Sequence, residues 1–413
     1  MNLQKSQSEY QKAQDLIFNG VKRMNMLADV YKYPLYFEKS KGAYTWDIDG
    51  NKYIDFISGK GAIVLGYSDD SVNKAVKDQI DRSNFMPLNS TAQNNLAELF
   101  IKEIPCAERV RFFRTGSCAA SALIRLARAC TGKDIILTTG YHGWHDSFMG
   151  GRAGVPTMID QNVMSFNYSL DLLKSLMESF KEKIAAIFIT PEPCFFNKNF
   201  YLDCYNIAKE NKVLFLLDEV KTGFRVNLHG YQHILDIVPD GACFSKAMSN
   251  GYPISAVAGS IELMEAEERT HLSGTFDTEV SCMEAAIQTI KQLKINDIHE
   301  IINKNGKYFA DQLSEVFNEY NFPAICKSDD PTAFHIVFKN EKTAEDFYCG
   351  CADRGVLFYC NNNVMMNASH TIEVIDIAVN VCRDTIKHMD NYPMLSIDNS
   401  DITAYLKRSR IQR

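Results

Sequence analysis

Between about residues 100 and 260, short runs of apolar residues alternate with longer segments whose apolar residues recur at helical spacing. The short runs predict buried strands, and the longer segments predict helices that cover them. The predicted strands are 110–113, 135–138, 184–190, 213–217 and 242–244, and the predicted helices are 119–130, 170–180 and 202–211. This alternation is typical of an α/β layer with a mainly parallel sheet.

The flanking segments predict a second, smaller part. Residues 44–57 alternate apolar and polar positions around Asp49-Gly50-Asn51, which predicts a β-hairpin. After a long helix at 280–293, the last third mixes predicted helices at 301–320 and 371–389 with strands at 335–338 and 356–359. A mixture of this kind is typical of an α+β domain.

The chain length agrees with this division. With 413 residues and roughly 150 residues per domain, two or three domains are expected. We predict an N-terminal segment 1–55, a large domain 56–295 and a C-terminal part 296–413, with the first and last segments packed together as the smaller domain.

Charge, hydropathy and cysteine usage exclude several classes of partner. Forty-four Lys and Arg against 51 Asp and Glu give a net charge of −7, which argues against nucleic acid as the ligand. The longest apolar runs are far shorter than the ~20 residues that cross a bilayer, and residues 1–10 are too polar for a signal peptide. The 12 cysteines lack zinc-ligand spacing. We expect a cytoplasmic protein with reduced thiols, no metal and no membrane contact.

Two charged residues end predicted strands. Asp218 follows the strand 213–217, and Lys246 follows the strand 242–244. Open α/β sheets bind ligands at such strand ends, and a partly desolvated lysine favours the neutral amine that can form an imine. Taken alone, each feature is also typical of an ordinary strand end.

The segment Thr115-Gly116-Ser117 joins a predicted strand to a predicted helix, and backbone N–H groups at a helix N-terminus bind phosphate well. Tyr141, after the strand 135–138, offers an aromatic ring for stacking. With Asp218 and Lys246, these features predict one ligand, a phosphorylated pyridine that carries an aldehyde. Its ring nitrogen, kept protonated by Asp218, would let the ring withdraw electrons.

Seven segments carry a family resemblance, and they are 41–55, 111–128, 140–143, 218–225, 244–253, 273–276 and 370–371. In this order the chain resembles the class III (ω-type) pyridoxal-phosphate aminotransferases of fold type I, most of all the glutamate-1-semialdehyde aminomutase branch. The resemblance implies pyridoxal 5'-phosphate as cofactor. It also implies a large domain with a mainly parallel, mixed sheet flanked by helices, and a smaller α+β domain.

The resemblance implies roles for individual residues. Lys246 would form the internal aldimine and shuttle a proton between the substrate and cofactor C4′, and Asp218 would bind the pyridinium nitrogen. The other implied cofactor contacts are Tyr141, His142 and Val220 at the ring, Gly116 and Ser117 at the phosphate, and Thr275 at the phosphate of a neighbouring subunit. This last contact implies a homodimer with shared active sites.

Three segments near these contacts differ from the family pattern or allow two interpretations. Cys118 replaces the usual acidic residue, either as a packing residue or as part of a reshaped cofactor rim, and Arg114 stands where asparagine is common. Glu192, in a family Glu-Pro segment, is either a substrate contact or part of a structural turn. The string 142–146 contains two histidines but lacks the helical spacing of a zinc protease motif.

Further departures bear on the substrate. Lys60 stands where an aromatic residue lines the aminomutase pocket, so it either binds an anionic substrate or reaches solvent. Arg23 is displaced by about three positions from the family's carboxylate-binding arginine. The acidic residue that the family has shortly before His370 is missing. Residues 361–363, three asparagines, occupy that loop and offer both donors and acceptors, which favours a sugar-like carbonyl acceptor.

The sequence therefore predicts an aminotransferase that moves an amino group from a donor such as an amino acid to a carbonyl acceptor, sugar-like or anionic, in a ping-pong reaction through Lys246. Two alternatives stay open. An aminomutase of the glutamate-1-semialdehyde type would move the amino group within one substrate molecule, and a non-catalytic protein would bind the cofactor without turnover.

Overall fold

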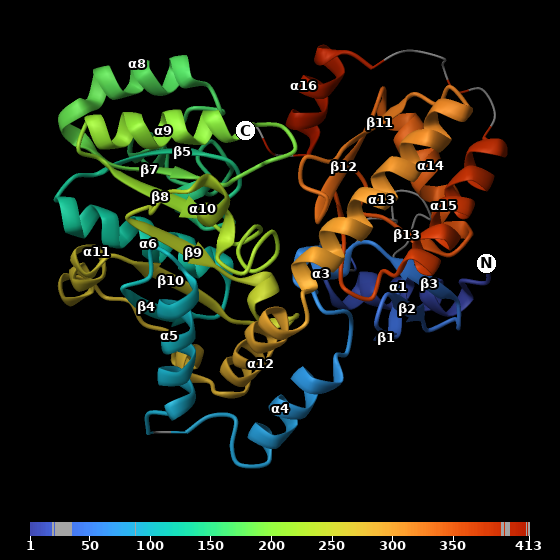
Figure 1. The fold of residues 1–413 in the computed structure, drawn as a ribbon, viewed down its shortest axis with the longest axis horizontal. Coiled ribbons are helices and arrows are strands. Elements are labelled where there is room, and N and C mark those ends of the chain that lie inside the picture. Colours follow the sequence, from blue (N-terminus) through green and yellow to red (C-terminus); the bar gives the residue numbers. More distant parts are fainter. Residues whose placement is uncertain are drawn as a thin grey trace. The chain divides into compact units, whose positions relative to one another are not determined.

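The structure is a computed structural model that describes residues 1–18, 20, 35–86, 88–389, 392, 397–409 and 411. The chain divides into two compact units (Figure 1). One unit contains Asp70–His299, and the other combines Met1–Asp69 with Glu300–Ser409. These divisions lie within about 14 residues of the domain boundaries predicted at 55/56 and 295/296.

The unit Asp70–His299 is built on a seven-stranded sheet in the order β4-β10-β9-β8-β7-β5-β6. Its strands are β4 (Arg109–Phe113), β5 (Ile135–Thr139), β6 (Val163–Ser165), β7 (Ile184–Ile189), β8 (Leu214–Asp218), β9 (Gly241–Phe244) and β10 (Ser255–Gly259). Neighbouring strands from β9 to β6 pair in parallel, whereas β10 runs antiparallel between β4 and β9. The predicted α/β fold with a mainly parallel, mixed sheet is confirmed.

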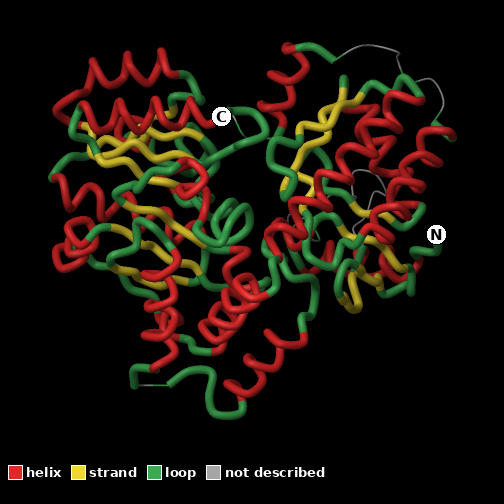
Figure 2. The backbone as a smooth tube through the Cα atoms, in the orientation of Figure 1, coloured by secondary structure: helices red, strands yellow, loops and turns green. Residues whose placement is uncertain are grey.

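Helices surround this sheet (Figure 2). They are α4 (Asp70–Ile80), α5 (Thr91–Glu103), α6 (Gly116–Thr131), α7 (Ile159–Asn162), α8 (Leu170–Phe180), α9 (Lys198–Glu210), α10 (Gly230–Leu235), α11 (Ile261–Glu265) and α12 (Ser281–Ile295). Helix α6 packs against β4, β7, β9 and β10, and α9 packs against β7 and β8. Short 3₁₀ turns include η3 (Lys246–Ser249) and η5 (Thr275–Thr278).

The core of this unit lies between α6 and the sheet. Helix α6 presents buried alanines together with Leu123 and Leu126 to Ile136, Leu216 and Val257 of the strands. Small residues on the helix allow a close approach, and each fully buried Leu or Ile stabilises the fold by about 1.5–3 kcal/mol. This packing fixes the strand ends from which the loops of the candidate site leave.

The unit formed by Met1–Asp69 and Glu300–Ser409 combines segments from both ends of the chain. Strands β2 (Tyr44–Asp47) and β3 (Lys52–Asp55) form the predicted hairpin. Strand β13 (Val356–Leu357) pairs in parallel with β3, which completes a sheet in the order β1-β2-β3-β13 with β1 (Phe37–Lys41). Residues from the two ends of the chain therefore share one sheet.

A second sheet in this unit contains β11 (Ala324–Lys327), β12 (Ala333–Phe338) and β14 (Asn363–Met365), in that order. The helices of the unit are α1 (Gln4–Leu16), α3 (Ser58–Gly61), α14 (Glu341–Asp353), α15 (Ile372–Lys387) and α16 (Asn399–Arg408), together with most of α13 (Ile298–Glu319). Within the described ranges, none of the helices combines the length and apolar character needed to span a bilayer.

Candidate active site

The carboxyl ends of β7, β8 and β9 meet at one edge of the seven-stranded sheet. These three strands are parallel neighbours, and Asp218, the last residue of β8, lies opposite Cys243 of β9. Lys246 follows Cys243 by three residues and begins η3. The sheet therefore brings Asp218 and Lys246, the two predicted catalytic residues, to the same edge.

The Asp218 carboxylate is buried, with only 1% of the residue exposed, and is held from several sides. Its Oδ2 accepts a hydrogen bond from His142 Nδ1 at 2.8 Å, and its Oδ1 accepts one from the Val220 backbone N–H at 3.0 Å. The Cys243 thiol lies 3.5 Å from the same Oδ1. A buried carboxylate with these donors is fixed in position for a further cationic partner.

His142 is locked in turn by its surroundings. Its ring stacks on Phe188 with centroids 4.1 Å apart, and its Nε2 hydrogen-bonds Thr138 Oγ1. The sequence predicts His142 as a cofactor contact, and the structure places it against Asp218. His145, three residues after His142, forms a hydrogen bond with Ser121 Oγ at 2.9 Å. The two histidines of the segment 142–146 therefore have different partners.

Lys246 is half-buried in an unusual backbone conformation. Its φ of +49° lies in the left-handed region, which costs a non-glycine residue of the order of 1–2 kcal/mol. Loss of solvation, followed by the charge of Lys221, lowers the pKa of Lys246 to about 8 from an ordinary 10.5. Near pH 8, about half of the molecules therefore carry Lys246 as a neutral amine, which is the nucleophilic form.

The predicted phosphate turn starts α6. Thr115 caps the helix, since its side chain accepts a hydrogen bond from the Cys118 backbone N–H at 3.2 Å. The first N–H groups of a helix have no partner within the helix, so Gly116 and Ser117 can offer theirs to an anion. Cys118 is half-buried and packs against the main core cluster.

Two glycines allow other residues to pack closely around this turn. A β-carbon on Gly116 would lie 2.9 Å from Val220 Cγ1, and one on Gly143 would lie 2.2 Å from Ser117 Oγ. Any larger residue would therefore fill the cradle or displace its walls. With the Asp218 carboxylate and the Lys246 amine on neighbouring strands, these residues can hold a pyridine that carries a phosphate and an aldehyde.

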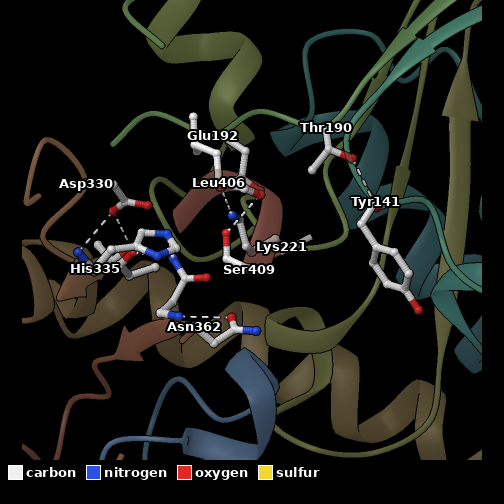
Figure 3. Close-up of polar contacts among 12 residues, drawn as sticks. Tyr141, Thr190, Glu192, Lys221, Asp330, His335, Asn362, Leu406 and Ser409 are labelled. Carbon is white, nitrogen blue, oxygen red and sulfur yellow. Dashed lines mark hydrogen bonds and ion pairs between the residues drawn. The ribbon is translucent and has the colours of Figure 1, made fainter. Parts of the chain in front are cut away.

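The other predicted contacts in this unit are more exposed. The Tyr141 carbonyl accepts a hydrogen bond from Thr190 Oγ1 at 3.1 Å, and 41% of Tyr141 is exposed (Figure 3). Thr275 begins η5 on the surface. Arg114 anchors this segment, because its guanidinium pairs with the Glu279 carboxylate at 3.2 Å and donates to the Asp277 carbonyl at 2.8 Å.

Glu192 forms a buried ion pair with Lys221 (Figure 3). The two side chains are only 8% and 12% exposed. The sequence interpretation of Glu192 did not single out Lys221. The available signal was its position, three residues after Asp218 in a loop that already carries a predicted catalytic group.

Neither of the two predicted substrate cations belongs to the described part of the unit Asp70–His299. Lys60 belongs to the unit Met1–Asp69 with Glu300–Ser409, where its ammonium lies 5.2 Å from the centre of the Tyr359 ring. Its φ of +59° is left-handed. Arg23 lies outside the described residues.

Comparison with known proteins identifies relatives over nearly the whole chain. Residues 26–388 match the family Aminotransferase class-III. A 3-aminobutyryl-CoA aminotransferase from Cloacimonas acidaminovorans (strain Evry) is 31% identical over 404 residues, 94% of this chain and 97% of the relative. A 2'-deamino-2'-hydroxyneamine transaminase from Streptomyces kanamyceticus is 31% identical over 353 residues, 83% and 89% of the two chains.

A glutamate-1-semialdehyde 2,1-aminomutase from Methanocaldococcus jannaschii is 34% identical over 348 residues, 78% of this chain and 81% of the relative. Among solved structures, the PLP internal aldimine form of the FumI protein from Sphingopyxis sp. MTA144 superposes with a TM-score of 0.87. It is 25% identical in sequence, and the match covers 93% of this chain and 96% of that one.

Proposed function

The chain belongs to the class-III aminotransferases, which use pyridoxal phosphate, and we propose that it transfers an amino group from an amino-acid donor to a carbonyl acceptor by a ping-pong reaction. One observation carries this proposal. A buried carboxylate, Asp218, ends strand β8, and a lysine with a lowered pKa, Lys246, follows the adjacent parallel strand β9.

When bound, pyridoxal phosphate supplies an electron-withdrawing ring that stabilises negative charge on a substrate carbon. Asp218, oriented by His142, would keep a proton on the ring nitrogen and so maintain that withdrawal. Lys246 would hold the cofactor through its amine. Once a donor displaces it, the same amine would take a proton from the substrate carbon and deliver it to C4′ of the cofactor.

The remaining contacts would orient the cofactor. The N-terminus of α6 at Gly116 and Ser117 would bind the phosphate, since N–H groups and the helix dipole favour an anion there. Val220, whose side chain lies beside Gly116, would pack against the ring, and the exposed Tyr141 ring would stack on it. Thr275 would serve the phosphate of a second subunit. The homodimer and the cytoplasmic location stay predictions.

The acceptor class is the finer part of the proposal. We propose a sugar-like or anionic carbonyl compound, with Lys60 and Arg23 as candidate anion contacts. One relative is named for 3-aminobutyryl-CoA and another for 2'-deamino-2'-hydroxyneamine, and these two names support the proposed acceptor classes. An aminomutase is the second candidate function, because a relative of that name is 34% identical to this chain.

A half-reaction distinguishes these functions. The loaded protein is mixed with one amino acid at a time, without an acceptor, and the keto acid is quantified. Transamination predicts one keto acid per cofactor, followed by regeneration when a carbonyl acceptor is added. Lys246→Ala serves as the control that should release none. Turnover of a single amino-aldehyde with no release of keto acid from any amino acid would instead identify a mutase.

A further inference from the structure

Three charged residues, Glu192, Lys221 and Lys246, follow the carboxyl ends of the three adjacent parallel strands β7, β8 and β9. Asp218 of β8 lies opposite Cys243 of β9, and Lys221 and Lys246 each follow one member of this pair by three residues. Glu192 follows the neighbouring strand β7. Strands β8 and β9 are parallel neighbours, so the segments that follow Asp218 and Cys243 start at the same edge of the sheet. Lys221 and Lys246 lie on these two segments.

The ammonium of Lys221 is fixed by Glu192. The two form an ion pair whose side chains are 12% and 8% exposed (Figure 3). Glu192 is itself anchored, because its backbone N–H donates to the Tyr201 hydroxyl at 2.8 Å. Charges removed from water are poorly screened, so a buried ammonium acts strongly on a neighbouring amine.

We propose that Lys221, anchored by Glu192, is a positioning residue that keeps the amine of Lys246 in its neutral, nucleophilic form, while Glu192 limits this effect. The inference rests on the proposed function, in which Lys246 is the cofactor lysine. It assigns a role to a second lysine, which the proposed function does not use.

The charges around Lys246 support this division of roles. Lys221 and Arg225 favour the neutral amine, whereas Asp218 and Glu192 favour the ammonium. Loss of solvation has the largest effect on the pKa of Lys246, and Lys221 has the largest effect of the charged groups. Removing Lys221 and removing Glu192 should therefore move the titration of Lys246 in opposite directions, which a purely structural role of the pair would not do.

The test measures Lys246 directly in the full-length chain after removal of the cofactor. Acetic anhydride labels neutral amines, and mass spectrometry of the peptide that contains Lys246 gives the labelling rate against pH. Lys221→Met should raise the midpoint from about 8 by ~1 unit, so that labelling at pH 8 falls about fivefold. Glu192→Gln should lower the midpoint, and Lys221→Arg should leave it near the wild-type value.

The matched control lies at the other end of the same sheet. Lys209 pairs with Asp240, just before β9, at 3.2 Å. Lys209→Met removes a lysine from an ion pair there and should leave the midpoint of Lys246 unchanged. An unchanged or lowered midpoint in Lys221→Met overturns the proposal, as does an equal rise in Lys209→Met.

The test gives a clear answer even if Lys221→Met does not fold or the protein lacks transaminase activity. If Lys221→Met does not fold, Glu192→Gln decides, because a lower midpoint supports the proposal and an unchanged or higher one overturns it. Labelling needs neither cofactor nor turnover, so its outcome is separate from that of the proposed function. A protein without transaminase activity can still show the opposite shifts, and an active enzyme can fail to show them.

Discussion

Replacing Lys246 with methionine should stabilise the cofactor-free protein at neutral pH. Methionine keeps most of the side-chain volume and removes a charge that the fold holds partly out of water. The pKa of Lys246 is about 8 in the folded chain and 10.5 ordinarily, a difference of 2.5. At about 1.36 kcal/mol per unit, the ammonium costs the folded state about 3 kcal/mol. For 413 residues this corresponds to a rise of about 4 °C in the thermal midpoint.

The cost of the Lys246 ammonium to the folded state should decrease as the pH rises. Below pH 8, Lys246 is protonated in both the folded and the unfolded chain, and the full cost is present. Between pH 8 and 10.5 the unfolded chain binds more protons than the folded chain, so wild-type stability rises with pH relative to the variant. Above 10.5 both forms are neutral and the cost has disappeared.

Thermal unfolding of the two cofactor-free proteins, followed by circular dichroism from pH 7 to 10.5, measures this difference. Lys209→Met, which removes a more exposed lysine, controls for the general loss of one positive charge and should change stability by less than about 1 kcal/mol. Equal stability of wild type and Lys246→Met at pH 7 would refute the reasoning. A difference that did not shrink between pH 8 and 10.5 would refute it as well.

The other predictions concern the cofactor cradle and its carboxylate. Gly143→Ala would set a β-carbon against Ser117 Oγ and should weaken pyridoxal phosphate binding about tenfold or more in a fluorescence titration. Gly132→Ala, also at positive φ but with open space around its β-carbon, should bind the cofactor normally, and equal losses in both variants would argue against the cradle. Asp218→Asn keeps the shape but removes the charge, so kcat should fall ~100-fold or more at full cofactor occupancy. A rate within threefold of wild type would exclude Asp218 as the ring-nitrogen partner.

The fold was readable from the sequence where apolar runs are uninterrupted and end sharply. Strand β8 is such a run, and it ends at Asp218 within one residue of the prediction. Strand β10 was not predicted, because Ser255-Ala-Val-Ala-Gly259 consists mainly of small residues with weak strand preference. It forms a strand because β4 and β9 both pair with it, a tertiary effect that no local pattern contains.

Local propensity also misplaced the start of α6. The sequence predicts this helix from residue 119, whereas it begins at Gly116. Glycine and serine are weak helix formers, and the cap at Thr115 overcomes their preference. The two phosphate-turn residues therefore lie in the first turn of the helix itself.

In the candidate site, some residues could be predicted from the sequence, whereas their contacts could not. Asp218 and Lys246 could be predicted because each ends a recognisable strand. The contact of His142 with Asp218 and that of Glu192 with Lys221 depend on which strands are neighbours in the sheet. Strand order is a property of the folded chain, so neither pairing could be deduced from spacing along the sequence.

Reductive trapping of the loaded protein tests the central claim most directly. Borohydride fixes pyridoxal phosphate covalently to the lysine that holds it, and peptide mapping by mass spectrometry identifies that lysine. We predict one cofactor per chain, on Lys246. Attachment to Lys221 or to any other lysine, or no attachment in a protein that binds the cofactor, would contradict the assignment of Lys246.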